Sequence, residues 1–455
     1  MGLIILMKFI AIGGGDEIGA SCFFLKIGKF NLILDSGMRF KGLRNYPKFH
    51  LIKKEIKNWF EIDFVCISHS HMDHIGSLPA LSQNIGKKPI YMTKPSYDLM
   101  EILIRDATKI QILKQSDEEI GDYPRIIAEE LYNDFIQKSN INLVNFSEEI
   151  NFHKDDEYLS LIFFPAGHIL GASMIYLNWE NSQNSKKILY TGDFSVTPME
   201  TVGNFKLPFN LDIDILITET TYANNPTVKN RKDEVKDLVY GIYEIIEKKG
   251  TVLIPSFALG RAQDLLIILS NLIPTSQIFV DGLTKSIIPI YEKFSKFGPY
   301  NFTDNFYNNN VNPVPVKLDE ISLIKRYPRS VIISSSGMLA NGSKSFKYAQ
   351  NLISDQKNGI FFTGYLDEES PGDQLLKIDK KMKFYETTIE ANINKFYLSA
   401  HPNNKELKDF INSINPKEAI IPVHGYESYN FFQKSNFKDK YHILYSKNNQ
   451  FIEMT

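Results

Sequence analysis

Cysteine is almost absent from this 455-residue chain: only Cys22 and Cys66 occur, and each lies in an apolar run. Two cysteines of this kind argue against the disulfide framework that small secreted proteins use. We therefore expect two buried thiols and a protein that works in a reducing compartment, the cytoplasm.

Long apolar runs are missing as well. No stretch reaches the roughly 20 apolar residues that a membrane-spanning helix needs. The apolar beginning of the chain, residues 1–12, lacks the charged start, the length and the small-residue cleavage site of a secretory signal. The sequence therefore predicts a soluble protein with no membrane partner.

An excess of one charge is also lacking, because 51 Lys and Arg residues nearly balance 53 Asp and Glu residues. Whole-chain charge thus gives no sign of affinity for nucleic acid, and any site for a polyanion must be a local patch. The apolar fraction of 43% is ample for burial, and the chain is longer than one hydrophobic core usually requires. We expect two compact lobes.

Short apolar runs that stop at glycine, proline or a polar residue recur along the chain. Those that we interpret as buried strands are 31–34, 63–67, 161–164, 187–190, 213–217, 251–254, 330–333 and 419–423. Stretches with apolar residues at helical spacing lie between several of them, for example 231–249 and 260–272. This alternation predicts an α/β fold.

The densest group of metal-binding side chains directly follows the expected strand 63–67. It is the sequence Ser-His-Ser-His-Met-Asp-His at 68–74. Imidazole and carboxylate are donors that zinc prefers, and alternating positions on a tight turn can point several of them at one centre. An isolated surface histidine does not explain four such side chains on one turn, so we predict a metal site here.

Further candidate ligands stand where other apolar runs stop. Asp35, His168, Asp193 and His424 each lie within two residues of a glycine, which lets the backbone turn sharply and approach a ligand closely. Taken one at a time, each is more often ordinary turn chemistry. Together they indicate one site at the strand ends.

These motifs resemble those of the β-CASP branch of the metallo-β-lactamase superfamily, which includes ribonuclease J and the nuclease subunit of the pre-mRNA cleavage and polyadenylation machinery. The resemblance covers essentially the whole chain from the glycine-rich run 13–22, and residues 69–74 match the superfamily signature. The runs 218–222, 254–263 and 398–401 match motifs that separate this branch from the β-lactamases.

The resemblance implies the ligands of two zinc ions per chain, with manganese as the alternative metal. His69, His71 and His168 would hold one ion, Asp73, His74 and His424 would hold the other, and Asp193 would bridge the pair. Asp35 matches an aspartate that orients the ligands rather than binding metal.

A mechanism follows from this chemistry. Two zinc ions about 3.5–4 Å apart can share a bridging hydroxide and clamp a phosphate during in-line attack. The departing sugar oxygen then needs a proton from a positioned acid. The resemblance gives this role to His401, oriented and charged by Glu219, and we count Asp73 with them among the catalytic residues. A buried structural histidine is the alternative for His401.

Two stretches are candidates for phosphate recognition. Ser335, Ser336 and Gly337 follow the expected strand 330–333 and resemble the family's Ser-Gly-Met loop, whose backbone amides can cradle an anion. Arg261, at an expected helix start, would add a phosphate contact. A plain polar turn and a packing arginine are the alternative interpretations.

The sequence departs from the family pattern at two places. Pro402 and Asn403 follow His401, where the family usually has a small residue and an aspartate. Asp373 stands near a position where relatives often have arginine, and a carboxylate there would weaken any phosphate contact. Both departures leave the ligand set intact and bear on the substrate alone.

The resemblance implies an α/β fold: a metallo-β-lactamase αββα sandwich from residues 1–205 and a returning segment 393–455, with an inserted α/β β-CASP domain at 206–392. It implies a metal-dependent hydrolase, a ribonuclease that cuts phosphodiester bonds internally, from the 5′ end, or both. Single-stranded RNA is the favoured partner, and whether the protein forms a homodimer is left open.

Three other functions are alternatives to this one. A DNA nuclease of the same branch is the nearest, but relatives acting on DNA commonly have an apolar residue where His424 stands, so the analogy favours RNA. A non-catalytic subunit of an RNA-processing assembly is disfavoured because every ligand is present. A small-molecule hydrolase or oxidoreductase would have no reason to carry the β-CASP motifs.

Overall fold

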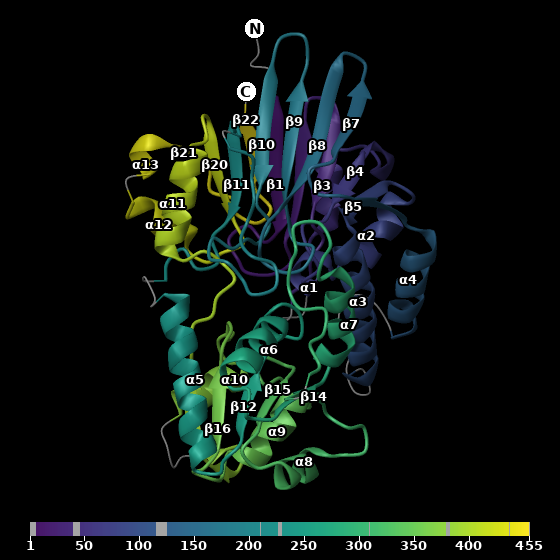
Figure 1. The fold of residues 1–455 in the computed structure, drawn as a ribbon. Helices are drawn as coiled ribbons and strands as arrows, with labels where there is room; N and C mark the ends of the chain where they lie inside the picture. The colour runs from purple at the N-terminus through teal and green to yellow at the C-terminus, as the bar shows by residue number, and fades with distance from the viewer. Residues whose placement is uncertain are drawn as a thin grey trace. The chain divides into compact units, whose positions relative to one another are not determined.

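The computed structural model describes residues 6–39, 46–114, 125–209, 211–225, 230–308, 310–378, 383–435 and 437–454 (Figure 1). The chain divides into two compact units. Unit 1 comprises Met1–Pro198, Asn204–Thr227 and His401–Thr455, and unit 2 comprises Met199–Gly203 and Val228–Ala400. The functional domain boundaries that we expect near 206 and 392 stay predictions.

Unit 1 is built on two sheets, each of seven strands in the described part of the chain. The first has the order β22 (Phe451–Met454), β1 (Met7–Gly13), β2 (Cys22–Ile27), β3 (Phe30–Leu34), β4 (Phe64–Cys66), β5 (Pro89–Thr93) and β6 (Asn140–Val144). The second has the order β21 (His442–Ile443), β20 (Ala419–Val423), β11 (Ile215–Glu219), β10 (Ser185–Tyr190), β9 (Ser173–Glu180), β8 (Glu157–Pro165) and β7 (Glu149–Lys154).

Both sheets are mixed. In the first, β22 to β3 pair antiparallel and β3 to β6 pair parallel. In the second, β7 to β10 are antiparallel neighbours, whereas β10, β11, β20 and β21 run parallel. Because parallel strands end at the same edge of a sheet, the residues that follow β10, β11 and β20 lie side by side.

The core of unit 1 lies between the two sheets. Alternate residues of each strand point into it, as the two-residue period of a strand requires. Phe23 and Leu25 from the first sheet and Leu161, Leu177 and Trp179 from the second belong to one cluster of buried apolar side chains. The sheets therefore pack face to face.

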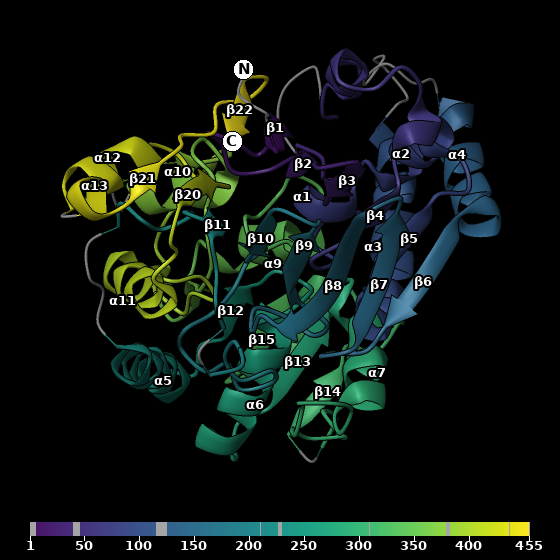
Figure 2. The ribbon, with the colours of Figure 1, turned by 90° about the horizontal axis from the view of Figure 1, so that it is seen from above.

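Helices cover the outer sides of unit 1 (Figures 1 and 2). Beside β4 and β5 lie α2 (Leu78–Ile85), α3 (Lys94–Lys114) and α4 (Arg125–Lys138), and beside β20 and β21 lie α11 (Asn404–Ile414), α12 (Ser428–Gln433) and α13 (Phe437–Lys440). Shorter elements of this unit are η1 (Phe49–Lys54), η2 (Trp59–Glu61) and α1 (Met72–Ile75). The expected αββα sandwich is confirmed.

Unit 2 contains a parallel sheet with the order β14 (Val311–Pro313), β13 (Ile278–Asp281), β15 (Val331–Ser334), β12 (Val252–Pro255), β16 (Gly359–Phe362) and β19 (Asn392–Lys395). Its described helices are α5 (Arg231–Glu247), α6 (Arg261–Leu272), α7 (Thr284–Phe294), α8 (Glu320–Arg326), α9 (Lys344–Leu352) and α10 (Pro371–Lys377), and β17 (Lys383–Phe384) pairs with β18 (Thr387–Thr388). Strands buried on both faces explain the continuous apolar runs in the sequence.

The helices expected at 231–249 and 260–272 are confirmed as α5 and α6. The Asn230 side chain caps α5 by accepting a hydrogen bond from Asp233 N at 3.0 Å. Among the described helices, none has the length and apolar character that crossing a membrane would take.

Leu161→Ala should destabilise unit 1. Leu161 is fully buried between Ile150 and Leu177 on the neighbouring strands, and a Leu→Ala change at such a site costs about 2–5 kcal/mol. Trp59 and Trp179 are the two tryptophans of the chain, and both belong to unit 1. Their fluorescence during urea unfolding therefore reports on this unit alone.

The matched control is Leu143→Ala, because Leu143 on β6 is 47% exposed. Its free energy of unfolding should stay within about 0.5 kcal/mol of the wild-type value. Equal losses for both variants would contradict the placement of the core between the sheets.

Candidate metal centre

The turn after β4 carries the first group of candidate ligands. His71 precedes the short helix α1, in which Asp73 and His74 lie. Backbone hydrogen bonds from Ser21 N to Asp73 O and from Ser36 N to His74 O, both 2.8 Å, hold this helix in place. Gly37 packs so closely that a Cβ atom there would lie 1.6 Å from Asp73 O, so this turn requires glycine.

One set of donor atoms comes from His69, His71, His168 and Asp193, which each place one within 4.8 Å of the others. The Nδ1 atom of His71 lies 3.2 Å from Nε2 of His69 and 3.1 Å from Nε2 of His168. Burial is the main reason why the pKa values of His69 and His71 are lowered, and a neutral ring keeps a lone pair for a metal.

The second set consists of Asp73, His74 and His424. His424 Nε2 lies 3.2 Å from Asp73 Oδ2. Burial lowers the pKa of His74 and His424, but the negative charge of Asp193 and the nearby carboxylates outweigh it and raise both values. The carboxylates therefore create a field that favours positive charge at this place.

Asp193 lies between the two sets. Its Oδ2 atom is 3.6 Å from His69 Nε2 and 3.4 Å from His74 Nε2, and its Oδ1 atom is 3.5 Å from His424 Nδ1. Burial raises the pKa of Asp193, but the surrounding histidines outweigh it and hold the value well below the usual range. Asp193 is therefore a carboxylate that faces both sets.

These side chains fit metal binding. They supply nitrogen and oxygen donors of the type that zinc prefers. His74 Nε2 and Asp193 Oδ1 are buried and make no hydrogen bond with any described residue, although buried polar atoms rarely lack a partner. A shared cation would satisfy both atoms.

Glu219, the last residue of β11, also lies within 4.8 Å of Asp193 and His424 donor atoms. Its carboxylate already accepts hydrogen bonds from Phe194 N at 2.8 Å, from His401 Nδ1 at 2.9 Å and from Thr221 Oγ1. We therefore interpret Glu219 as a hydrogen-bond acceptor rather than as a metal ligand.

His401 stands at the edge of the metal centre. Its ring centroid lies 4.6 Å from that of His168, and its Nδ1 atom is within hydrogen-bonding distance of both oxygens of Glu219. Burial would lower the pKa of His401, but the charge and hydrogen bond of Glu219 outweigh it and raise the pKa to about 9. The side chain is 19% exposed, so this protonated imidazole remains accessible.

The loop that carries His401 leads into α11, and Asn403 caps that helix. The Asn403 side chain accepts hydrogen bonds from the backbone of Lys405 and Glu406, while Glu406 Oε2 accepts from Asn403 N at 3.0 Å. Asparagine thus serves as the N-cap as well as an aspartate would, so this departure from the family pattern keeps the helix start. Glu406 also accepts a short hydrogen bond from Thr197 on the loop that follows Asp193.

Asp35 contacts the turn that carries the first candidate ligands. Its fully buried carboxylate accepts hydrogen bonds from Ser68 N and Ser68 Oγ, both at 2.7 Å, from His74 Nδ1 at 2.8 Å and from Tyr190 OH at 2.6 Å. Because Nδ1 of His74 donates its hydrogen bond to Asp35, the Nε2 atom on the other side of the ring faces Asp193. The sequence pattern indicated Asp35 but did not reveal Ser68, Tyr190 or Glu406; only Glu406 had a signal, the Asn-x-x-Glu capping box.

The residues expected to contact phosphate belong to unit 2. Ser335 Oγ accepts a hydrogen bond from Leu283 N at 3.0 Å, and Ser336 Oγ accepts from Met338 N at 3.3 Å. A Cβ atom on Gly337 would lie 2.9 Å from Phe257 N, so glycine allows a close backbone approach there. Arg261 is the first residue of α6 and is 8% exposed. Their phosphate-binding role stays a prediction.

Asp373, noted in the sequence as a replacement for a cation, lies on α10. It forms an ion pair with Lys377 at 2.8 Å, one helical turn further along. Burial raises the pKa of Asp373, but its hydrogen bond with Lys377 outweighs this and lowers the value.

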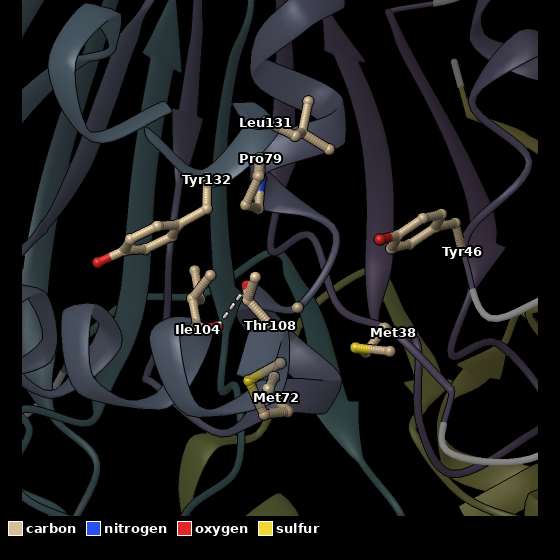
Figure 3. A pocket seen from close by; sticks show the side chains of 10 residues that line it. Met38, Tyr46, Met72, Pro79, Ile104, Thr108, Leu131 and Tyr132 are labelled. Carbon is tan, nitrogen blue, oxygen red and sulfur yellow. Dashed lines mark hydrogen bonds between the residues drawn. The ribbon is translucent and has the colours of Figure 1, made fainter. Parts of the chain in front are cut away.

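A small hollow behind α1 is lined largely by apolar side chains (Figure 3). Met72 borders it from α1, Ile104 and Thr108 from α3, and Leu131 and Tyr132 from α4. The ten described residues that line it include none of the candidate ligands. The hollow therefore belongs to the packing of the helices and not to the metal centre.

The fold and the site of unit 1 define a metallo-hydrolase of metallo-β-lactamase architecture. Three family models match the chain: a metallo-β-lactamase superfamily domain at residues 24–203, a Beta-Casp domain at 262–375, and a Zn-dependent metallo-hydrolase RNA specificity domain at 386–434.

Known proteins align with almost the whole chain. It is 33% identical over 442 residues to the RNase J-like protein of Methanocaldococcus jannaschii, covering 94% of each chain. It is 30% identical to transcription termination factor FttA of Methanothermobacter thermautotrophicus, covering 92% of this chain and 67% of that protein. The chain belongs to the β-CASP family of metallo-β-lactamase-fold metallo-hydrolases, as its motifs predicted.

Other relatives are longer or more distant. The chain is 31% identical to an Integrator complex subunit 11 homolog of Dictyostelium discoideum, but it spans only 57% of that protein. A protein of unknown function from Enterococcus faecalis V583 has a solved structure that matches with a TM-score of 0.58 and 14% identity, covering 99% of this chain and 100% of that one. At this identity the likeness shows the fold alone.

Asp35→Asn should weaken metal binding. All the groups around the carboxylate donate hydrogen bonds, so an amide would bring its own donors against them and release His74. Outer hydrogen-bond partners of this kind are typically worth 10–100-fold in metal affinity, and the buried mismatch should cost about 1–3 kcal/mol of stability. Competition with a chelator measures the first effect, and urea unfolding measures the second.

The control is Asp212→Asn, which removes an exposed carboxylate paired with Lys187 and Lys417. Surface pairs of this kind contribute little to stability, and Asp212 is not among the candidate ligands, so stability and zinc affinity should both stay at the wild-type values. Wild-type zinc affinity in Asp35→Asn would show that Asp35 does not orient the ligands.

Proposed function

We propose that this protein is a two-metal ribonuclease that hydrolyses phosphodiester bonds in RNA, internally, from the 5′ end, or both. The observation that carries the proposal is the pair of His and Asp donor sets that share Asp193, with the His401–Glu219 pair beside them. Relatives named as an RNase J-like protein and an endoribonuclease support RNA as the substrate.

We assign the ligands as two sets with one shared carboxylate. His69, His71 and His168 would hold one ion, Asp73, His74 and His424 the other, and Asp193 both. Zinc is the proposed metal, with manganese as the alternative. When bound, the metal pair would activate water and neutralise the charge of the phosphate.

The chain's own residues would handle the leaving group. Glu219 accepts a hydrogen bond from Nδ1 of His401, which leaves the Nε2–H group to protonate the departing sugar oxygen. The acid needs both a proton at neutral pH and a fixed ring, and Glu219 provides both through its charge and its hydrogen bond. Asp73 would take part in catalysis as a metal ligand, and its carboxylate lies next to His424.

Substrate binding would involve the inserted domain, which we propose to extend over residues 206–392. Ser335, Ser336, Gly337 and Arg261 would contact phosphates of single-stranded RNA. The cytoplasmic location of the protein and its assembly into a homodimer stay predictions.

Incubation with end-labelled RNA tests the proposal directly. Purified wild-type protein with added zinc should cut 5′- and 3′-labelled single-stranded RNA and leave a DNA of the same sequence largely intact. Asp193→Ala should abolish the cleavage and lower zinc binding at both positions, because this residue faces both donor sets.

The product ladders distinguish the alternatives. Cleavage of DNA in preference to RNA would indicate a DNA nuclease of the same family. Absence of cleavage with two zinc ions bound would point to a non-catalytic subunit. Cleavage that survives in Asp193→Ala would show that the activity does not come from this centre.

His401→Ala should separate metal binding from proton transfer. General acid catalysis is typically worth 10²–10⁴-fold, so RNA cleavage should slow by about that factor while the zinc content stays at the wild-type value. A nitrophenyl phosphodiester has a leaving group that needs little protonation, so its hydrolysis should be affected much less. The two rates, measured with matched zinc loading, give the comparison.

Glu219→Gln is the companion variant. It keeps an acceptor near His401 Nδ1 but removes the charge, so its effect on RNA cleavage should be milder and have the same substrate dependence. If His401→Ala releases zinc or slows both substrates equally, then His401 is a ligand or a structural residue, and the acid lies elsewhere.

A further inference from the structure

Thr221 lies two residues beyond Glu219 in the loop that follows β11, and its hydroxyl contacts residues on both sides of the centre. The Oγ1 atom makes a short hydrogen bond with Glu219 Oε2 and lies 3.1 Å from His424 Nδ1. It also lies 3.2 Å from the backbone oxygen of His424. One hydroxyl group therefore reaches the acid pair and a candidate metal ligand together.

We propose that Thr221 is a positioning residue that fixes the tautomer and ring orientation of His424 and joins this histidine to the His401–Glu219 pair. The inference rests on the proposed function, because it gives His424 the role of a metal ligand.

The donor and acceptor roles follow from counting protons. A hydroxyl group has one proton to donate, and a carboxylate can only accept. The short contact therefore commits the Thr221 proton to Glu219, and neither the His424 ring nor its carbonyl oxygen can receive it. Toward the ring, Oγ1 can then act only as an acceptor, and its 3.1 Å distance from Nδ1 fits a hydrogen bond donated by Nδ1–H of His424.

This tautomer leaves the correct nitrogen for a metal. With Nδ1 protonated, the lone pair of a neutral His424 ring is on Nε2, which lies 3.2 Å from Asp73 Oδ2. Two atoms that both present lone pairs at that distance need a cation or a proton between them. Thr221 thus directs Nε2 toward the set formed with Asp73 and His74.

The same carboxylate serves the acid. Glu219 accepts from Thr221 on Oε2 and from Nδ1 of His401, so a continuous chain of hydrogen bonds runs from His424 through Thr221 and Glu219 to His401. Such chains hold their members in one arrangement because each bond restricts the next. A single hydroxyl therefore supports both metal binding and proton donation.

The backbone alone does not set the His424 ring. His424 has a positive φ of 49°, and its N–H group donates to Gly14 O at 2.7 Å, which places the Cα atom. Gly425 packs against Thr220, whose hydroxyl donates to Val423 O at 3.0 Å. These contacts bring the loops after β11 and β20 together. The rotation of the ring is set by side chains, and at Nδ1 the Thr221 hydroxyl, at 3.1 Å, is closer than Asp193 Oδ1, at 3.5 Å.

Three variants of the full-length protein test this role. Thr221→Val keeps the shape and removes the hydroxyl, Thr221→Ser keeps the hydroxyl, and Thr108→Val on α3 removes a buried hydroxyl that donates to Ile104 O at 2.9 Å. In chelator competition with zinc, Thr221→Val should bind one of the two ions 10–100-fold more weakly, the usual effect of losing such a partner. Thr221→Ser and Thr108→Val should bind both ions with wild-type affinity.

A double-mutant comparison adds a second check. In a His424→Ala background, Thr221→Val should have no further effect on zinc affinity, because the ring on which it acts is gone. A similar loss in Thr108→Val, or unchanged zinc binding in Thr221→Val, would overturn the inference.

Ring nitrogen shifts decide the question without any metal. In metal-free protein with nitrogen-15-labelled histidine, at a pH where the rings are neutral, His424 should be protonated at Nδ1 in the wild type and in Thr221→Ser. Thr221→Val should show a mixture of tautomers. A mixture of tautomers already present in the wild type would contradict the role of Thr221. If the wild type binds no zinc, the proposed function fails, but this test of Thr221 still applies.

Discussion

The buried carboxylate of Asp35 makes the hydrogen bonds on which the arrangement of the two sheets around the candidate ligands depends. It follows β3 in one sheet of the sandwich, and it receives a hydrogen bond from Tyr190 in the opposite sheet and others from Ser68 and His74. An unpaired charge in such a place would be very costly, so all of these donors are needed. The same bonds that satisfy the charge fix the turn after β4, the distance between the sheets and the direction of His74.

This arrangement leaves buried nitrogen and oxygen atoms without hydrogen-bond partners in the described part of the protein. His74 Nε2 and Asp193 Oδ1 lack hydrogen bonds among the described residues, and the pKa values of neighbouring histidines are shifted in opposite directions. Metal that binds only the folded chain should stabilise unit 1, since its binding free energy adds to that of folding.

The sequence predicted those parts of the site that motifs carry. Short spacing identified the turn 68–74, and apolar runs that stop at Asp193 and His424 identified the strand ends. The long-range hydrogen bonds of Thr221 and Glu406 could not be predicted in this way, because their partners His424 and Thr197 lie 203 and 209 positions away and become neighbours only when the sheet and α11 form. The sequence also does not indicate to which acceptor a threonine hydroxyl donates its hydrogen bond.

The parallel pairing of β11 with β20 also determines when, during synthesis of the chain, the candidate centre can form. Unit 2 occupies most of the chain between these strands, and β22, which pairs with β1, contains nearly the last residues. While the ribosome is still making the first 400 residues, His401 and His424 have not yet been added. A chain made only this far therefore cannot complete the donor set that contains His424, so the candidate centre can form only after unit 2 has been made.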